Sequence, residues 1–205
     1  MQSEVNQDDV AIRQVRGFFY DLAKSFFLED PDQEKIERWR EIINPLGAEA
    51  PSMALAEAAR QLSLALAELD LPAIKNEYYD FFVNPFSHQL ISWTVSSSVN
   101  GRNFGPQLVE IRQLMAKQGL VKEEEFKEPE DSLPVLLDLM TRLIEMEDGL
   151  GDGGVTAQQH ILQKFLIPLT TYIHQQLQAG TGAGFYALCA GFLEAWLQLD
   201  ESYFI

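Results

Sequence analysis

The sequence predicts an all-α fold, a single-domain helical bundle of roughly eight or more helices, and three observations carry this prediction. Apolar residues recur at helical spacing through most of the chain, residues that favour helix ends separate these segments, and no stretch alternates with period two over a useful length. The 205 residues contain no obvious repeat and no second hydrophobic unit. We therefore expect residues 1–205 to form one all-helical domain that buries about 70% of its unfolded surface.

Four amphipathic segments make up the first half of the chain, and each follows or begins with a residue suited to start a helix. They cover residues 10–27, 32–43, 52–69 and 72–82. We expect the second segment to stop at residues 44–47, whose sequence is Asn-Pro-Leu-Gly. The reason is that Pro removes a backbone donor from a helix interior and Gly favours helix ends.

Four further helices are expected in the second half, joined by segments of distinct character. The helices cover residues 107–119, 131–147, 156–178 and 185–199. Residues 122–130 are mostly charged, residues 148–154 have the acidic sequence DGLGDGG of a flexible loop, and residues 179–184, AGTGAG, favour a hinge. Asp131 or Ser132 is expected to cap the helix that follows it.

The charge and the single cysteine restrict the classes of partner and compartment. With 15 basic and 31 acidic residues the net charge is −16, which repels nucleic acid and anionic membrane surfaces and attracts cationic partners. Cys189 has no second cysteine to pair with, and its apolar surroundings favour a buried structural thiol. Because the N-terminal residues lack a basic and apolar export signal and no apolar run reaches membrane-spanning length, we expect a cytoplasmic protein without stable membrane insertion.

Sequence patterns typical of enzymes and cofactor sites are incomplete or missing. Gly149, Gly151 and Gly154 match G-x-G-x-x-G, but a helix and not a strand precedes them. A calcium loop in the same place would need Glu where the chain has Gln159. There is no Walker sequence, and none of the three histidines follows a Glu by three residues as a di-iron site requires. We expect no catalytic residues, no metal site and no tightly bound cofactor.

The stretch from residue 77 to residue 105 departs from plain amphipathic helix. It begins with an aromatic cluster, breaks at Asn84-Pro85, and carries Trp93 in a segment rich in Ser, Thr and Val. A second unusual element, EPEDSLPVLLDLM, occupies residues 128–140. Aromatic residues, Pro and Asn in such positions indicate a binding surface that the other segments hold in place.

These two elements resemble the signatures of the TorD/DmsD/NarJ family of redox-enzyme maturation chaperones. The first family pattern reads approximately EY-x-x-LF-V-G-P, and the residues that fit it are Glu77, Tyr78, Phe82, Val83 and Pro85. Phe81 stands where the pattern has Leu, and Asn84 stands where it has Gly. Trp93 resembles the aromatic of the following loop, and residues 103–105 resemble the L-x-G segment before the next helix.

The second family signature, E-P-x-D-H, is met by Glu128, Pro129 and Asp131, with Ser132 in the place of His. The C-terminal region is also similar, because the pair Phe185-Tyr186 opens the last helix. Leu169 stands where many members have Trp. The resemblance spans nearly the whole chain.

The resemblance implies a fold, a function and partners. The family is all-helical and cytoplasmic, and its members are not enzymes. They bind the twin-arginine signal peptide, or a related N-terminal segment, in the precursor of a molybdoenzyme catalytic subunit, and hold export back until the cofactor is inserted. Members occur as monomers or domain-swapped homodimers, and guanine nucleotide binding is known for some of them.

The predicted leader-binding residues follow from this resemblance and from the chemistry of the leader. A twin-arginine leader combines guanidinium groups with an apolar stretch, so its receptor needs carboxylates beside an aromatic and aliphatic groove. We expect the aromatic residues to form the wall of the groove, Trp93 to be exposed in it, and Glu128 and Asp131 to attract the arginines. The complete predicted set is Tyr78, Phe81, Phe82, Pro85, Trp93, Phe104, Glu128, Pro129, Asp131 and Ser132.

Plainer interpretations of the same residues remain open at this stage. The aromatic residues could belong to the core, Asp131 could serve only as a helix cap, and Pro129 could serve only to keep the backbone extended before the helix. Two other classes of function are also open. The protein could be a general helical interaction scaffold, or an enzyme with an unrecognised Ser or Cys nucleophile.

Overall fold

The computed structural model describes residues 7–28, 30–123, 126–181 and 184–204. The described residues form an all-α fold without a named strand, which confirms the predicted fold class. The elements in chain order are α1 (Gln7–Phe27), α2 (Gln33–Glu49), α3 (Met53–Glu68), α4 (Leu71–Tyr78), the π-helical turn η1 (Tyr79–Val83), α5 (Val95–Asn100), α6 (Pro106–Lys117), α7 (Leu133–Glu145), α8 (Glu147–Leu150), α9 (Asp152–Ile161), the π-helical turn η2 (Leu162–Leu166), α10 (Ile167–Thr181), α11 (Phe185–Glu201) and the 3₁₀ turn η3 (Ser202–Phe204).

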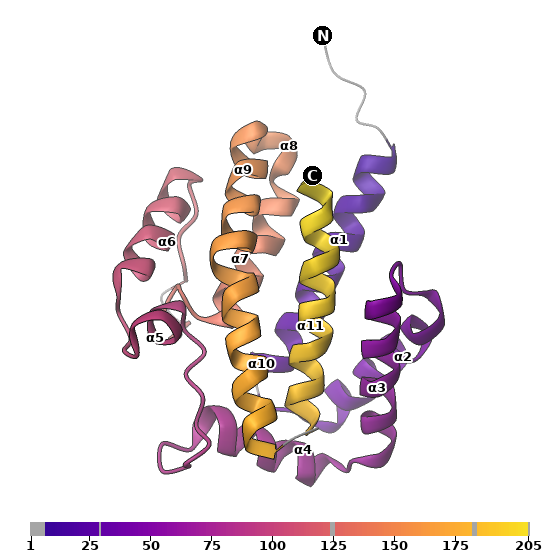
Figure 1. Cartoon of the computed structure of the whole chain (residues 1–205). Helices are drawn as coiled ribbons and strands as arrows, with labels where there is room; N and C mark the ends of the chain where they lie inside the picture. Colours follow the sequence, from indigo (N-terminus) through magenta and orange to yellow (C-terminus); the bar gives the residue numbers. More distant parts are fainter. Residues whose placement is uncertain (1–6, 29, 124–125, 182–183, 205) are drawn as a thin grey trace.

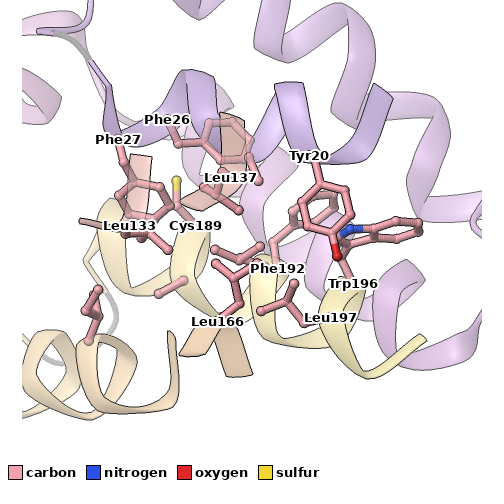
Figure 2. Close-up of a cluster of buried hydrophobic side chains, with 14 of the residues drawn as sticks. Tyr20, Phe26, Phe27, Leu133, Leu137, Leu166, Cys189, Phe192, Trp196 and Leu197 are labelled. Carbon is pink, nitrogen blue, oxygen red and sulfur yellow. The ribbon is translucent and has the colours of Figure 1, made fainter. Parts of the chain in front are cut away.

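The long helices α1, α7, α10 and α11 form the centre of the bundle. Figure 1 shows the pair α2 and α3 on one side of these helices and α5 and α6 on the other side. The core is densely aromatic where α1 meets α11: Phe19 stacks on Trp196 with ring centroids 4.3 Å apart, and Phe26 lies edge-on to Phe192 at 6.1 Å. The buried residues labelled in Figure 2 come from α1, α7, η2 and α11, and they are Tyr20, Phe26, Phe27, Leu133, Leu137, Leu166, Cys189, Phe192, Trp196 and Leu197.

Cys189 is buried in this core, as the sequence predicts. Burial raises the pKa of its thiol well above the ordinary value, because the apolar surroundings disfavour the thiolate. The thiol is therefore a structural group at neutral pH.

A buried ionic cluster joins α1 to the C-terminal end of α11. The Arg16 guanidinium donates to both carboxylate oxygens of Asp200, at 2.6 and 3.2 Å, and the Tyr20 hydroxyl donates to Asp200 Oδ2 at 2.7 Å. Arg16 also lies 3.7 Å from Glu147 at the start of α8 and stacks over the ring of Tyr203. The cluster fixes α1 against the C-terminal end of α11.

The carboxylate of Glu77, on α4, caps the last helix of the bundle. Its two oxygens accept the backbone N–H groups of Phe185 and Tyr186, at 3.1 and 3.2 Å, in the first turn of α11. Because the first N–H groups of a helix have no partner within it, a carboxylate from another helix can satisfy them. This contact holds the aromatic stretch that begins at Glu77 against the core.

The expected end of the second helix at residues 44–47 is wrong, because α2 passes through Pro45 and continues to Glu49. Neighbouring α3 stabilises this last turn: Arg60 donates to the carbonyl of Gly47 at 2.8 Å, and Ser63 donates to Asn44 Oδ1 at 2.6 Å. Pro in a helix interior is unfavourable, and local sequence alone predicts that the helix ends there. Contacts with α3 outweigh this cost.

Residues 148–150 and 152–154 are helical and Gly151 forms a turn between them, so the expected loop over residues 148–154 is wrong. The short helix α8 ends at Leu150, Gly151 has a positive φ of 55°, and α9 begins at Asp152. The Gln158 side chain donates to the carbonyl of Leu143 and to Glu147, at 3.3 and 2.9 Å, and ties α9 to α7 and α8. Of the predicted hinge, residues 182–183 lie outside the described residues, while residues 179–181 belong to α10 and Gly184 is the N-cap of α11.

Candidate functional site

The two unusual sequence elements meet side by side in the structure. Thr94 and Ser132 form an isolated antiparallel bridge. The Val95 amide donates to the Asp131 carbonyl and the Leu133 amide donates to the Trp93 carbonyl, both at 2.9 Å. Segments that lie about 35 residues apart in sequence thus share one short two-stranded contact at the entrances of α5 and α7.

Asp131 lies at the centre of this contact and caps a helix other than its own. Its side chain is completely buried, and Oδ2 accepts the Ser96 N–H at 2.9 Å, in the first turn of α5. The expectation that Asp131 or Ser132 caps α7 through its side chain is not met: Ser132 occupies the N-cap position of α7 but makes no side-chain capping bond. A buried carboxylate at the start of α5 satisfies a backbone donor and favours the positive end of the helix dipole.

The start of α5 is in turn connected to the start of α6. Ser96 Oγ accepts the Gly105 N–H at 2.9 Å, and Asn103 Oδ1 accepts the Thr94 hydroxyl at 2.8 Å. Polar contacts therefore help to fix the segment between residues 92 and 105, together with the buried side chain of Val95. Its short helix, α5, was not expected from a sequence so rich in Ser, Thr and Val.

Trp93 links the aromatic stretch to the acidic stretch. Its indole stacks on Phe82 with ring centroids 4.9 Å apart and planes at 17°, and its Nε1–H donates to Glu128 Oε2 at 3.0 Å. Phe82 in turn lies edge-on to Tyr186 at 5.2 Å and to Phe27 at 6.1 Å. Trp93 is half-buried, so the expectation that it is exposed is wrong. The indole N–H holds the Glu128 carboxylate beside the aromatic group.

The structure divides the predicted residues into three sets by burial. Tyr78, Phe81, Asp131 and Ser132 lie in the interior; Phe82, Trp93, Glu128 and Pro129 are half-buried; Pro85 and Phe104 are exposed. Residues of the first set do not line the surface of this structure, because their side chains face the core. Phe104 lies in a positive-φ conformation with φ of 62° and is 75% exposed, so its ring projects from the loop before α6.

The predicted leader-binding set does not include four exposed apolar side chains beside this group: Tyr79, Val83, Phe86 and Leu90. Tyr79 and Val83 belong to the π-helical turn η1, in which Phe81 is buried in the core while Tyr79 and Val83 are about half exposed. The Asn84 N–H donates to the Tyr79 carbonyl at 2.7 Å and closes this turn. The break at Asn84-Pro85 was the available signal, since irregular backbone next to aromatic residues often presents side chains to solvent.

Charged groups surround the acidic stretch. Arg112 donates to Glu130 at 2.9 Å, and Lys122 donates to the backbone carbonyl of Glu128. Burial is the largest single effect on Glu130 and raises its pKa, but the hydrogen bond from Arg112, a backbone hydrogen bond and the charges of Arg112 and Lys122 together lower the pKa below its ordinary value. No group of three or more His, Cys, Asp or Glu side chains among the described residues could hold a metal ion. The chemistry available is recognition by a carboxylate, an indole and apolar side chains.

Residues 48–173 match the model of a protein family described as nitrate reductase delta subunit. This match covers more than half of the chain. The chain belongs to this family. The family assignment confirms the resemblance drawn from the two sequence elements, both of which lie inside the matched region.

Two relatives of this family member carry the name chaperone protein TorD. The protein from Vibrio atlanticus is 25% identical over 214 residues, which cover 96% of this chain and 98% of the relative. The protein from Photobacterium profundum is 29% identical over 97 residues, 45% of each chain. These relatives place the chain among chaperones and not among enzymes. No helix among the described residues is long and apolar enough to cross a membrane.

Proposed function

We propose that this chaperone binds the twin-arginine leader, or a related N-terminal segment, of a molybdenum-containing oxidoreductase subunit in the cytoplasm, and delays export until the cofactor is inserted. The observation that carries the proposal is the contact of Trp93 with both Phe82 and Glu128. It unites an aromatic surface and a carboxylate, the two chemical features that a leader with guanidinium groups and an apolar stretch requires.

The apolar part of the leader would contact the exposed side chains of η1 and the loop after it. Val83, Phe86 and Leu90 are 49%, 89% and 44% exposed, and transfer of such side chains from water stabilises a complex by about 25 cal/mol per Å² of apolar surface. The loop that carries them is held in place, because the Ile91 N–H donates to the Phe81 carbonyl at 2.8 Å. Pro85 and Phe104 extend the same kind of exposed surface in the proposal.

The guanidinium groups of the leader would lie near Glu128 and against the half-buried indole of Trp93. A guanidinium over an aromatic face contributes roughly 0.5 to 2 kcal/mol, depending on how far it is desolvated. The net charge of −16 attracts a basic leader at long range. The buried residues of the predicted set, Tyr78, Phe81, Asp131 and Ser132, then act as positioning residues beneath this surface and do not contact the leader.

A synthetic twin-arginine leader peptide tests the proposal when its affinity is measured by isothermal titration calorimetry. We expect Phe86→Ala and Glu128→Gln each to weaken binding by roughly five- to tenfold, corresponding to about 1 to 1.4 kcal/mol. Phe18→Ala, which removes a half-exposed aromatic ring from α1 outside the proposed leader surface, is the matched control and should bind as the parent does. Replacing the two leader arginines with lysines should also weaken binding, because lysine lacks the planar fork.

Binding of the leader with equal affinity by the parent, Phe86→Ala and Glu128→Gln would reject this surface. Absence of any leader binding by the parent protein would reject the leader as the ligand. Helix content and thermal midpoint of each variant should match the parent, since the substituted side chains are exposed or half-buried and carry little of the core.

A further inference from the structure

Helix α1 carries a second exposed apolar surface, N-terminal to Phe27, the residue of this helix that contacts Phe82 of the candidate leader site. Ile12, Val15 and Phe18 are 41%, 48% and 45% exposed and lie on one face of the helix. Figure 1 shows the N-terminal half of α1 with α2 and α3 on one side of the bundle, and α5 and α6 on the opposite side. A row of half-exposed apolar residues on a helix whose opposite face is fully packed indicates a surface for another molecule.

Two hollows lie along this face of α1, and we call them together the α1 groove. The first has a volume of about 400 Å³ and is lined by Ile12 and Val15 of α1, by Pro51, and by Trp196 and Leu199 of α11. Almost all of the surface that lines it belongs to apolar atoms. Its inner wall contains the Arg16–Asp200 pair, whose charges neutralise each other.

The second hollow has a volume of about 350 Å³ and follows the same helix toward its C-terminal end. Phe18, Leu22 and Leu28 line it from α1 and the residue after it, and Arg38 and Ile42 line it from α2. The remaining lining residues are polar: Asp21, Lys24, Ser25 and Lys35, of which Asp21 and Lys24 form an ion pair at 2.8 Å. From Ala11 to Leu28 the groove is about 26 Å long, at 1.5 Å per helical residue. This length fits a helix of about 15 residues, which spans about 22 Å.

The two ends of the α1 groove differ in charge. Arg38 is exposed and forms no ion pair with the residues that the structure describes, and Lys35 lies beside it at the same end. At the other end Asp9 is exposed two residues before Ala11, and Glu49 is exposed two residues before Pro51; Ala11 and Pro51 both line the first hollow. A ligand that matches both ends carries negative charge at one end and positive charge at the other.

We propose that the α1 groove binds an amphipathic helix of a partner protein, with an acidic first turn over Arg38 and a basic last turn near Asp9 and Glu49. This partner helix lies antiparallel to α1. Its apolar stripe covers Val15 and Phe18, in the mode by which amphipathic helices enter apolar grooves. Acidic residues in the first turn and basic residues in the last turn also stabilise the partner helix itself.

A second copy of this chain fits the groove less well than such a helix. Two copies would bring net charges of −16 together, and this repulsion opposes association. The leader also fits less well, because its basic groups precede its apolar stretch and are not balanced by acidic groups at the opposite end. Binding of a second copy and binding of the leader are both distinguished from binding of the helix by the following experiment.

The probe is a fluorescent 15-residue peptide with Leu at positions i, i+3, i+4 and i+7, Glu in the first turn and Lys in the last turn. Its binding to the full chain is measured by fluorescence anisotropy. We expect Val15→Lys to weaken binding about tenfold, because it places a charge in the apolar contact. Arg38→Glu should weaken binding about threefold at low salt, and this difference should shrink as salt screens the exposed charges.

Phe86→Ala is the matched control and should bind this peptide as the parent does, while Val15→Lys should bind the leader peptide as the parent does. Equal affinity of the parent and Val15→Lys for the helical peptide would overturn the proposal. Weakened leader binding by Val15→Lys would also overturn it, since the groove would then be the leader site. If the parent protein sediments as a dimer and Val15→Lys as a monomer, the groove binds a second copy and the proposal is likewise overturned. If Val15→Lys lowers the thermal midpoint, Phe18→Ala serves as an independent variant. We expect Phe18→Ala to weaken binding of the helical peptide as well.

Discussion

Replacement of Asp131 by alanine tests whether this carboxylate acts inside the protein or on the leader. The change removes the acceptor of the Ser96 N–H and leaves this buried donor without a partner. An unsatisfied buried donor costs about 1 to 3 kcal/mol, and loss of a helix-capping side chain falls in the same range. Because both figures describe the same contact, we expect a total loss of about 2 kcal/mol in the free energy of unfolding.

Thermal and urea unfolding followed by circular dichroism measure this loss. For a chain of this size, 2 kcal/mol corresponds to a decrease of roughly 4 to 8 °C in the unfolding midpoint. Asp131→Asn is the matched control, because the amide oxygen can still accept the Ser96 N–H in a side chain of the same shape. We expect it to lose less than half as much stability and to bind the leader peptide as the parent does.

Two results would refute this reasoning. Unchanged stability of Asp131→Ala would show that the contact with Ser96 contributes nothing to folding. Weakened leader binding by Asp131→Asn at parental stability would show that the charge itself acts on the leader, although the structure places the side chain away from solvent.

Two further changes test the ionic contacts of the bundle. Asp200→Ala removes the hydrogen-bonded carboxylate partner of the buried Arg16 guanidinium, so the free energy of unfolding measured in urea should fall by about 3 to 5 kcal/mol. A loss below about 1 kcal/mol would contradict the role of the cluster in joining α1 to the end of α11. The hydrogen bond from Lys164 lowers the pKa of Glu110 in the folded protein. The ionised carboxylate therefore stabilises the folded state at pH values above the pKa that Glu110 has in the unfolded chain. This contribution is lost as the pH falls through the lower pKa of the folded state. The difference in thermal midpoint between the parent and Glu110→Gln should therefore be present at about pH 7 and vanish in acid, and a difference that persists at about pH 2 would contradict this assignment.

Much of the fold could be predicted because helical periodicity is a local property of the chain. The apolar spacing in residues 131–147 marks α7, and the spacing in residues 10–27 marks α1, with ends within a few residues of those in the structure. Ser52, the first residue of the predicted segment 52–69, caps α3, since its side chain accepts the Leu55 N–H three residues later. Each of these features depends on residues within one or two turns of one another.

The departures have a common cause in contacts between distant segments. Pro45 remains within α2 because Arg60 and Ser63 of α3 stabilise that turn. Residues 148–150 and 152–154 are helical, and one reason is that the Gln158 side chain donates a hydrogen bond to the carbonyl of Leu143. Local composition favours a break or a loop in both places, and packing decides against it.

The candidate site was predicted as a set of residues but not as an arrangement. Sequence alone indicated the two elements, their family and an acidic protein with one buried thiol. Only the tertiary structure decided that Asp131 caps α5 instead of its own helix, that Trp93 lies between Phe82 and Glu128, and that Phe86 and Leu90 carry the exposed surface. The physical reason is that a periodic pattern tells which face of a helix is apolar, whereas the partner of a buried polar atom is set by segments far away in the sequence.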